Sequence, residues 1–165
     1  MNSKKVTFGL LIFYLAALTW IIIFKMQFSY ETLPHIKNIN LIPFGASMIT
    51  NGQIDYHEII QNVLAFIPYG LFIHILLEKK NFLCQIIPVI LTSVIFEAVQ
   101  YFLGIGATDI TDVITNSSGG VIGIFIAFIL SLIFRRNWRK IINFLSLVCA
   151  VLLTLFIALL HLFNS

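Results

Sequence analysis

Five apolar runs, each close to the length of a membrane-spanning helix, constrain this chain more than any other feature. They cover about residues 6–24, 57–77, 82–103, 113–134 and 141–163. A helix needs about 20 apolar residues to cross a bilayer, whereas strands of an outer-membrane barrel are about half as long and alternate apolar with polar residues. The sequence therefore predicts an all-α integral membrane protein, with residues 1–165 forming a single membrane domain of about five transmembrane helices.

Composition and charge agree with this class and predict an orientation. Hydrophobic residues make up 59% of the chain and charged residues 10%, whereas soluble domains are about 25% charged. Eight of the ten basic residues lie on one side of the expected bundle, and only Lys25 and Lys37 lie on the other. Because basic residues beside membrane spans stay in the cytoplasm, we expect a cytoplasmic N-terminus and an extracellular C-terminus. The cations then face anionic lipid headgroups, so their partner is the lipid bilayer and no nucleic acid is expected.

Glu97 lies inside the third apolar run, with Gln100 three residues later. A carboxylate in hydrocarbon is costly, so a residue of this kind normally faces the bundle interior and marks an ion, proton or substrate site. The alternative is a structural pair in which Glu97 and Gln100 are hydrogen-bonded.

Polar and small residues recur at helical spacing in three consecutive runs. Steps of three or four residues place them on one face of each helix. The three faces hold, in order, Glu58, Asn62, Ala65 and Tyr69; Ser93, Glu97, Gln100 and Gly104; and Asp109, Asp112, Asn116, Gly120 and Gly123. At a rise of 1.5 Å per residue, Asn62, Glu97 and Asn116 would lie roughly 5 to 9 Å below the outer surface. We therefore expect one polar pocket that is open to the outside.

Two acidic motifs predict where helices begin. Asp55 followed by Glu58 resembles a capping box, which would start the second helix just outside the membrane. Asp109 or Asp112 would cap the fourth helix, whose dipole favours a negative charge at its start.

Small residues and one proline predict how the helices pack. Gly119, Gly123 and Ala127 form a series of small residues four positions apart, which lets a neighbouring helix approach closely. Pro68, near the middle of the second run, is expected to kink or interrupt that helix.

The first outer loop is too apolar to be a solvated linker. We expect it to form a short amphipathic, interfacial or re-entrant segment that covers the pocket. The apolar residues of this segment are Leu41, Ile42, Phe44, Met48 and Ile49.

Five separated motifs, in order along the chain, resemble the signature of the VanZ-like family. They are residues 40–44 (NLIPF), Asn62 with residues 66–70 (FIPYG), residues 97–100 (EAVQ), residues 109–112 (DITD), and Asn116 with Gly119 and Gly120. The VanZ-like core would cover about residues 40–134, flanked by the first helix, 6–24, and the last, 141–163.

The resemblance implies a multi-pass protein of the bacterial cytoplasmic membrane, in a family named for low-level teicoplanin resistance in Gram-positive bacteria. Its outward acidic pocket would bind a lipid-linked or cell-wall ligand. The ligand-binding residues would be Asn40, Asn62, Glu97, Gln100, Asp109, Asp112 and Asn116. Family members often carry an arginine shortly before the Asp-x-x-Asp motif, whereas residues 103–108 of this chain contain no cation.

Two other functions fit the same residues. In a membrane enzyme acting on a lipid or wall intermediate, Glu97 would be the general acid or base, and Asp109 or Asp112 its catalytic partner or a metal ligand. In a small proton-coupled transporter, Glu97 would carry the proton. The carboxylates Glu97, Asp109 and Asp112, with His57 and His35, would suit calcium, magnesium or manganese, whereas no His-x-x-x-His or cysteine-rich spacing for zinc is present. We expect neither a metal nor another cofactor.

Overall fold

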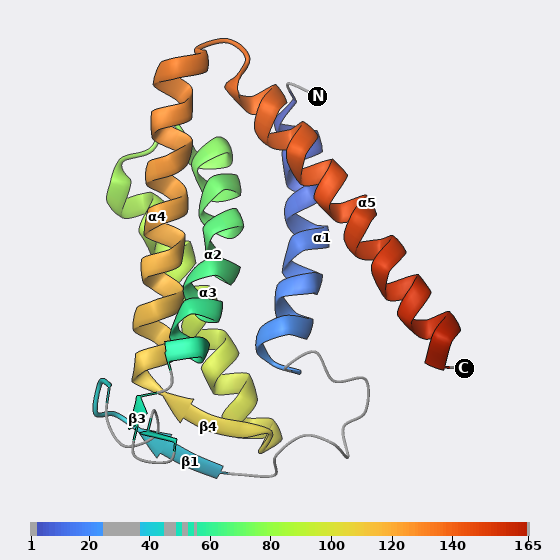
Figure 1. Ribbon diagram of the computed structural model, residues 1–165. Coiled ribbons are helices and arrows are strands. Elements are labelled where there is room, and N and C mark those ends of the chain that lie inside the picture. The colour runs from blue at the N-terminus through green and yellow to red at the C-terminus, as the bar shows by residue number, and fades with distance from the viewer. Residues whose placement is uncertain (1–2, 25–36, 45–48, 51–52, 55, 165) are drawn as a thin grey trace.

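The computed structural model describes residues 3–24, 37–44, 49–50, 53–54 and 56–164 of the chain. In the described part, five long helices run up and down through one bundle (Figure 1). Their bounds are Lys4–Ile22 for α1, Tyr56–Leu77 for α2, Phe82–Leu103 for α3, Ile110–Phe134 for α4 and Trp138–Asn164 for α5. Each is long and apolar enough to cross a membrane. The five predicted spans are confirmed, and they fit a multi-pass membrane protein.

Helices α2 and α4 form the most extensive contact of the bundle. A Cβ atom on Gly119 or Gly123 would overlap a backbone carbonyl of α2, and one on Gly70 of α2 would overlap the carbonyl of Gly120. Ala127 is fully buried one turn further along α4. Close backbone approach through small residues is the usual way for helices to associate in lipid. The packing role predicted for Gly119, Gly123 and Ala127 is therefore confirmed.

The other helices surround this pair. Helix α3 packs on α4, where the Val89 side chain fills the space above Gly120. Helix α1 packs on α2, and α5 contacts α1 and α4 before it diverges from the bundle (Figure 1). A buried hydrogen bond, in which the Thr7 hydroxyl donates to Asn143 Oδ1 at 3.0 Å, joins α1 to α5. The core that positions the site thus consists of α2, α3 and α4.

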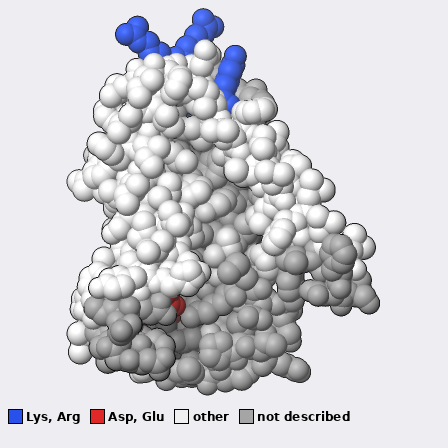
Figure 2. All heavy atoms as spheres, viewed as in Figure 1, with Lys and Arg blue, Asp and Glu red and all other residues white. Residues whose placement is uncertain are grey.

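Basic side chains lie at one end of the bundle, called here the basic end. They belong to the start of α1 and to the α2–α3 and α4–α5 connections, and Figure 2 shows them gathered at the upper end of the molecule. Glu78 accepts hydrogen bonds from Arg139, and Lys4 Nζ lies 3.7 Å from the same carboxylate. One acidic residue therefore ties α1, α2 and α5 together at this end.

Short strands lie at the opposite end, called here the strand end (Figure 1). Strand β1 (Lys37–Asn40) pairs in parallel with β4 (Gly106–Asp109), so that Asn40 is the partner of Asp109. Strands β2 (Ile49–Thr50) and β3 (Gln53–Ile54) pair antiparallel. These strands are short, and the all-α architecture predicted from the sequence is confirmed in the five long helices. The described part of the first loop is a strand followed by an exposed turn at residues 41–44, while Met48 lies outside the described residues.

Helix α2 continues through Pro68, so of the two outcomes expected there the interruption is wrong, while the kink stays a prediction. A proline in a helix removes a single backbone hydrogen bond, and the residues on both sides of it stay packed against neighbouring helices. Helix α1 also holds one turn of α2, because the Tyr14 hydroxyl of α1 donates a hydrogen bond to the carbonyl of Ala65 in α2. The capping box predicted at Asp55 lies outside the described residues.

Candidate functional site

Asp109 joins the strands to the helices at the strand end. It is the last residue of β4 and the N-cap of α4, and its Oδ1 accepts a hydrogen bond from the Thr111 backbone N–H at 2.8 Å. An aspartate in this position satisfies a free N–H group and places a negative charge at the positive end of the helix dipole. Of the two caps considered from the sequence, Asp109 is therefore confirmed. Asp112 lies in the first turn of α4.

Asn40 is brought to Asp109 by the pairing of β1 with β4. Its Nδ2 donates to Asp109 Oδ2 at 3.0 Å. Its Oδ1 accepts from the backbone N–H of Ile42, and its Nδ2 also reaches the Ile42 carbonyl, so the same side chain shapes the turn after β1. One amide thus links the first loop to the start of α4.

Glu97 is buried against β4, with only 3% of its surface exposed. Its Oε2 accepts a hydrogen bond from the Asp109 backbone N–H at 3.0 Å, and its carbonyl accepts one from the Thr108 hydroxyl at 3.2 Å. Its other carboxylate oxygen, Oε1, is buried and has no hydrogen-bond partner in the structure. A buried polar atom of this kind is unusual in a folded protein and needs an explanation.

A second hydrogen bond at the strand end involves α2. Asn62 Nδ2 donates to Asp112 Oδ1 at 2.8 Å and joins α2 to α4. The charges of Asp112, Asp109 and Glu58 all act on the Glu97 carboxyl group. We call Glu58, Glu97, Asp109 and Asp112 the acidic cluster.

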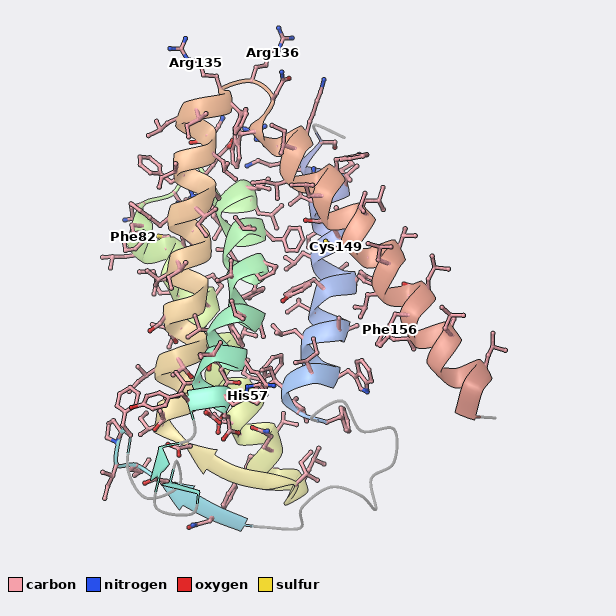
Figure 3. The ribbon with its side chains drawn as sticks, viewed as in Figure 1. His57, Phe82, Arg135, Arg136, Cys149 and Phe156 are labelled. Carbon is pink, nitrogen blue, oxygen red and sulfur yellow. The ribbon has the colours of Figure 1, made fainter. Side chains whose placement is uncertain are left out.

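Figure 3 shows oxygen-bearing side chains gathered near the labelled His57, at the end of the bundle opposite the labelled Arg135 and Arg136. The acidic cluster therefore lies far from the basic end. In the described part of the chain, no group of three or more His, Cys, Asp or Glu side chains has an arrangement that could hold a metal ion.

Two predicted site residues have their hydrogen bonds elsewhere. Gln100 Nε2 donates to the carbonyl of Ile22, at the end of α1, rather than to Glu97. Asn116, one turn further into α4 than Asp112, donates from Nδ2 to the Ser93 hydroxyl of α3 at 3.0 Å. Both side chains are buried, and Gln100 Oε1 and Asn116 Oδ1 have no hydrogen-bond partner in the structure. The hydrogen-bonded pair of Glu97 with Gln100, considered as a structural alternative, is not formed.

Two threonines at the site were not singled out from the sequence. Thr111 is fully buried, and its hydroxyl accepts a hydrogen bond from the Phe44 backbone N–H at 2.9 Å, which holds the turn after β1 against α4. Phe44 has a φ of 54°, a conformation that is strained for a bulky residue. Thr108 holds β4 to the end of α3. Their places beside Asp109, a predicted cap, are the one signal that could have pointed to them.

Comparison with known proteins assigns the family. The model of the VanZ/LLP1 family matches residues 11–131, which is most of the chain and includes every residue of the acidic cluster. The chain belongs to the VanZ/LLP1 family. Protein VanZ of Enterococcus faecium is 39% identical to this VanZ/LLP1 protein over 124 residues, which cover 74% of this chain and 73% of that protein. No solved structure matches the chain. The resemblance seen in the five sequence motifs is therefore confirmed.

Proposed function

We propose that this VanZ/LLP1 protein binds a lipid-linked or cell-wall ligand at its acidic cluster, on the outer side of the bacterial cytoplasmic membrane. Through this binding it would contribute to low-level resistance to teicoplanin, the property for which the VanZ-like family is named. The binding residues we propose are Asn40, Asn62, Glu97, Asp109 and Asp112.

The orientation follows from the separation of charge between the two ends of the bundle. Basic side chains line the basic end, and the acidic cluster belongs to the strand end. Basic residues beside membrane spans stay in the cytoplasm, which supports an orientation with the strand end outside. Glu97 lies six residues before the end of α3, a depth of about 9 Å at 1.5 Å per residue. A ligand that approaches from the outer leaflet would reach this depth.

One observation carries the proposal, the buried and unpaired Oε1 of Glu97. Leaving a buried acceptor without a donor costs about 1–3 kcal/mol, and more when the group is charged. Sites that tolerate such a cost are commonly functional sites, where a ligand supplies the missing contact.

Glu97→Gln tests the proposal. The substitution keeps the shape of the side chain and an acceptor for the Asp109 N–H, but it removes the charge. We expect cells that produce the variant to lose the increase in teicoplanin resistance given by the wild-type protein. Minimum inhibitory concentrations would be compared at equal membrane abundance and equal thermal stability of the purified proteins.

Glu78→Gln is the matched control, because it makes the same chemical change at the basic end. We expect this variant to keep the wild-type resistance. If a folded Glu97→Gln protein gave the same resistance as the wild type, the proposed role of the acidic cluster would be wrong.

A further inference from the structure

We infer that the ligand enters the acidic cluster through a primary ammonium group, carried by a lipid headgroup or by a small soluble amine. This inference rests on the proposed function, because it names the chemistry of the ligand that the cluster would bind. Three properties of the site support this inference. They are the unpartnered buried oxygens, the charge of the acidic cluster and the geometry of the Glu97 carboxyl group.

Among the described residues, the buried side-chain atoms without a hydrogen-bond partner are Glu97 Oε1, Gln100 Oε1, Asn116 Oδ1 and Ser117 Oγ. The first three are oxygens of a carboxyl group and of two amides, and only the serine hydroxyl can also donate. The side-chain amide nitrogens of the same region all donate: Asn40 to Asp109, Asn62 to Asp112, Gln100 to Ile22 and Asn116 to Ser93. A ligand that completes the site must therefore bring N–H or O–H donors rather than acceptors.

The charge of the cluster favours a cation. The carboxylates of Asp109, Asp112 and Glu58 act on Glu97 in a mostly buried setting, where screening by solvent is weak. An anion such as a phosphate would need the free N–H groups at the start of α4. There, however, the Thr111 N–H is already bonded to Asp109, and the Asp109 N–H is bonded to Glu97. The start of the helix thus already carries the negative charge of its own cap, Asp109, which disfavours an anionic ligand there.

The geometry of the Glu97 carboxyl group favours a primary ammonium group over other cations. A guanidinium group binds best to two wholly free oxygens of one carboxylate, whereas Oε2 of Glu97 already accepts from the Asp109 N–H and Oε1 is its one oxygen without a partner among the described residues. A quaternary ammonium group has no N–H to donate to Oε1. Among the described residues, no group of His, Cys, Asp and Glu side chains is arranged to hold a metal ion. A primary ammonium group has three diverging N–H donors, which suits single oxygens offered by separate side chains.

The test uses the full-length protein purified into nanodiscs of phosphatidylglycerol. Ethylammonium is the soluble probe, and tetramethylammonium, which lacks N–H donors, is its control. Phosphatidylethanolamine, mixed into the nanodisc, is the lipid probe, and phosphatidylcholine is its matched control. Binding is measured as a saturable rise in the melting temperature and by native mass spectrometry.

We expect ethylammonium, phosphatidylethanolamine or both to bind, and the two control compounds to have no effect. Binding of the soluble amine alone would identify a small amine as the ligand class, and binding of the lipid alone would identify a headgroup. Glu97→Gln should weaken binding at least tenfold, and Glu78→Gln should leave it unchanged. If Glu97→Gln does not fold, Asp112→Asn serves in its place, because it removes a neighbouring charge.

The inference is overturned if neither primary amine binds, or if the quaternary compounds bind equally well. That result leaves the proposed function standing when Glu97→Gln still abolishes resistance. Conversely, amine binding that depends on Glu97, together with unchanged resistance in Glu97→Gln, would keep the ammonium site and refute the role in resistance.

Discussion

The hydrogen bond between Asn40 and Asp109 can be reversed by exchanging the two side chains. In the double variant Asn40→Asp with Asp109→Asn, the amide would donate from position 109 to a carboxylate at position 40. The net charge of the protein is unchanged. Each single variant, in contrast, places two donors or two carboxylates opposite each other across the 3.0 Å contact.

The magnitude follows from the contacts of the two residues. Asp109 is 6% exposed, and a hydrogen bond to a buried charged group contributes about 1.5–3 kcal/mol. Asparagine caps a helix as well as aspartate does, so Asp109→Asn keeps the bond to the Thr111 N–H. We expect each single variant to lower the free energy of unfolding by about 1.5–3 kcal/mol. The double variant keeps the reversed hydrogen bond and loses the weak 3.3 Å contact from Asn40 to the Ile42 carbonyl, and should stay within about 1 kcal/mol of the wild type.

The assay is equilibrium unfolding in mixed micelles with increasing sodium dodecyl sulfate, followed by the loss of helical circular dichroism. The four proteins form a double-mutant cycle, from which we expect a coupling free energy of at least about 2 kcal/mol. Asn81→Asp is the control for the amide-to-acid change, because Asn81 is an exposed N-cap at the start of α3. If the losses of the two single variants simply add in the double variant, the contact does not hold β1 to α4.

Two further predictions concern the bundle itself. Gly123→Ala places a Cβ against the Ile67 carbonyl of α2 and should lower the free energy of unfolding by about 1–3 kcal/mol. Gly9→Ala is the control, because its Cβ meets open space beside α1, and it should leave the free energy of unfolding unchanged or raise it. If the two glycine variants changed this free energy equally in the micelle assay, the close packing of α2 on α4 would be contradicted. Glu78→Gln removes the negative charge that pairs with Arg139 and should cost about 1 kcal/mol, because the pair is partly exposed. The cost should shrink as salt is added, and a salt-independent loss would argue against an ion-pair contribution.

The helices of this protein were predictable because their signals are local. A run of about 20 apolar residues is itself enough to specify a membrane helix. The cap at Asp109 and the small-residue face of α4 are likewise properties of a few neighbouring residues. The helix-interrupting effect expected at Pro68 was wrong, because one missing hydrogen bond does not outweigh the packing along the rest of α2.

The partners of the candidate site residues were less predictable. The helical spacing correctly placed Asn62, Glu97 and Asp112 on faces that meet in one buried layer. It also grouped Gln100 and Asn116 with them: Asn116 does bond to Ser93, a residue of the predicted face of α3, whereas Gln100 bonds to the carbonyl of Ile22 at the end of α1. Spacing tells which side of a helix a residue occupies, but the partner that it meets depends on the rotation and depth of the neighbouring helix.

The sequence by itself determined the number of helices, their approximate bounds and the separation of the charged residues between the two ends of the bundle. Hydrophobic length and charge act on each segment independently, so no knowledge of its neighbours was needed. Only the tertiary structure decided that β1 pairs with β4 and that Asn40, Glu97 and Asp109 meet. Asn40 and Asp109 are 69 positions apart, and strands of four residues are too short for a periodic signal in the sequence. Their pairing arises because the surrounding helices bring the two segments to the same end of the bundle.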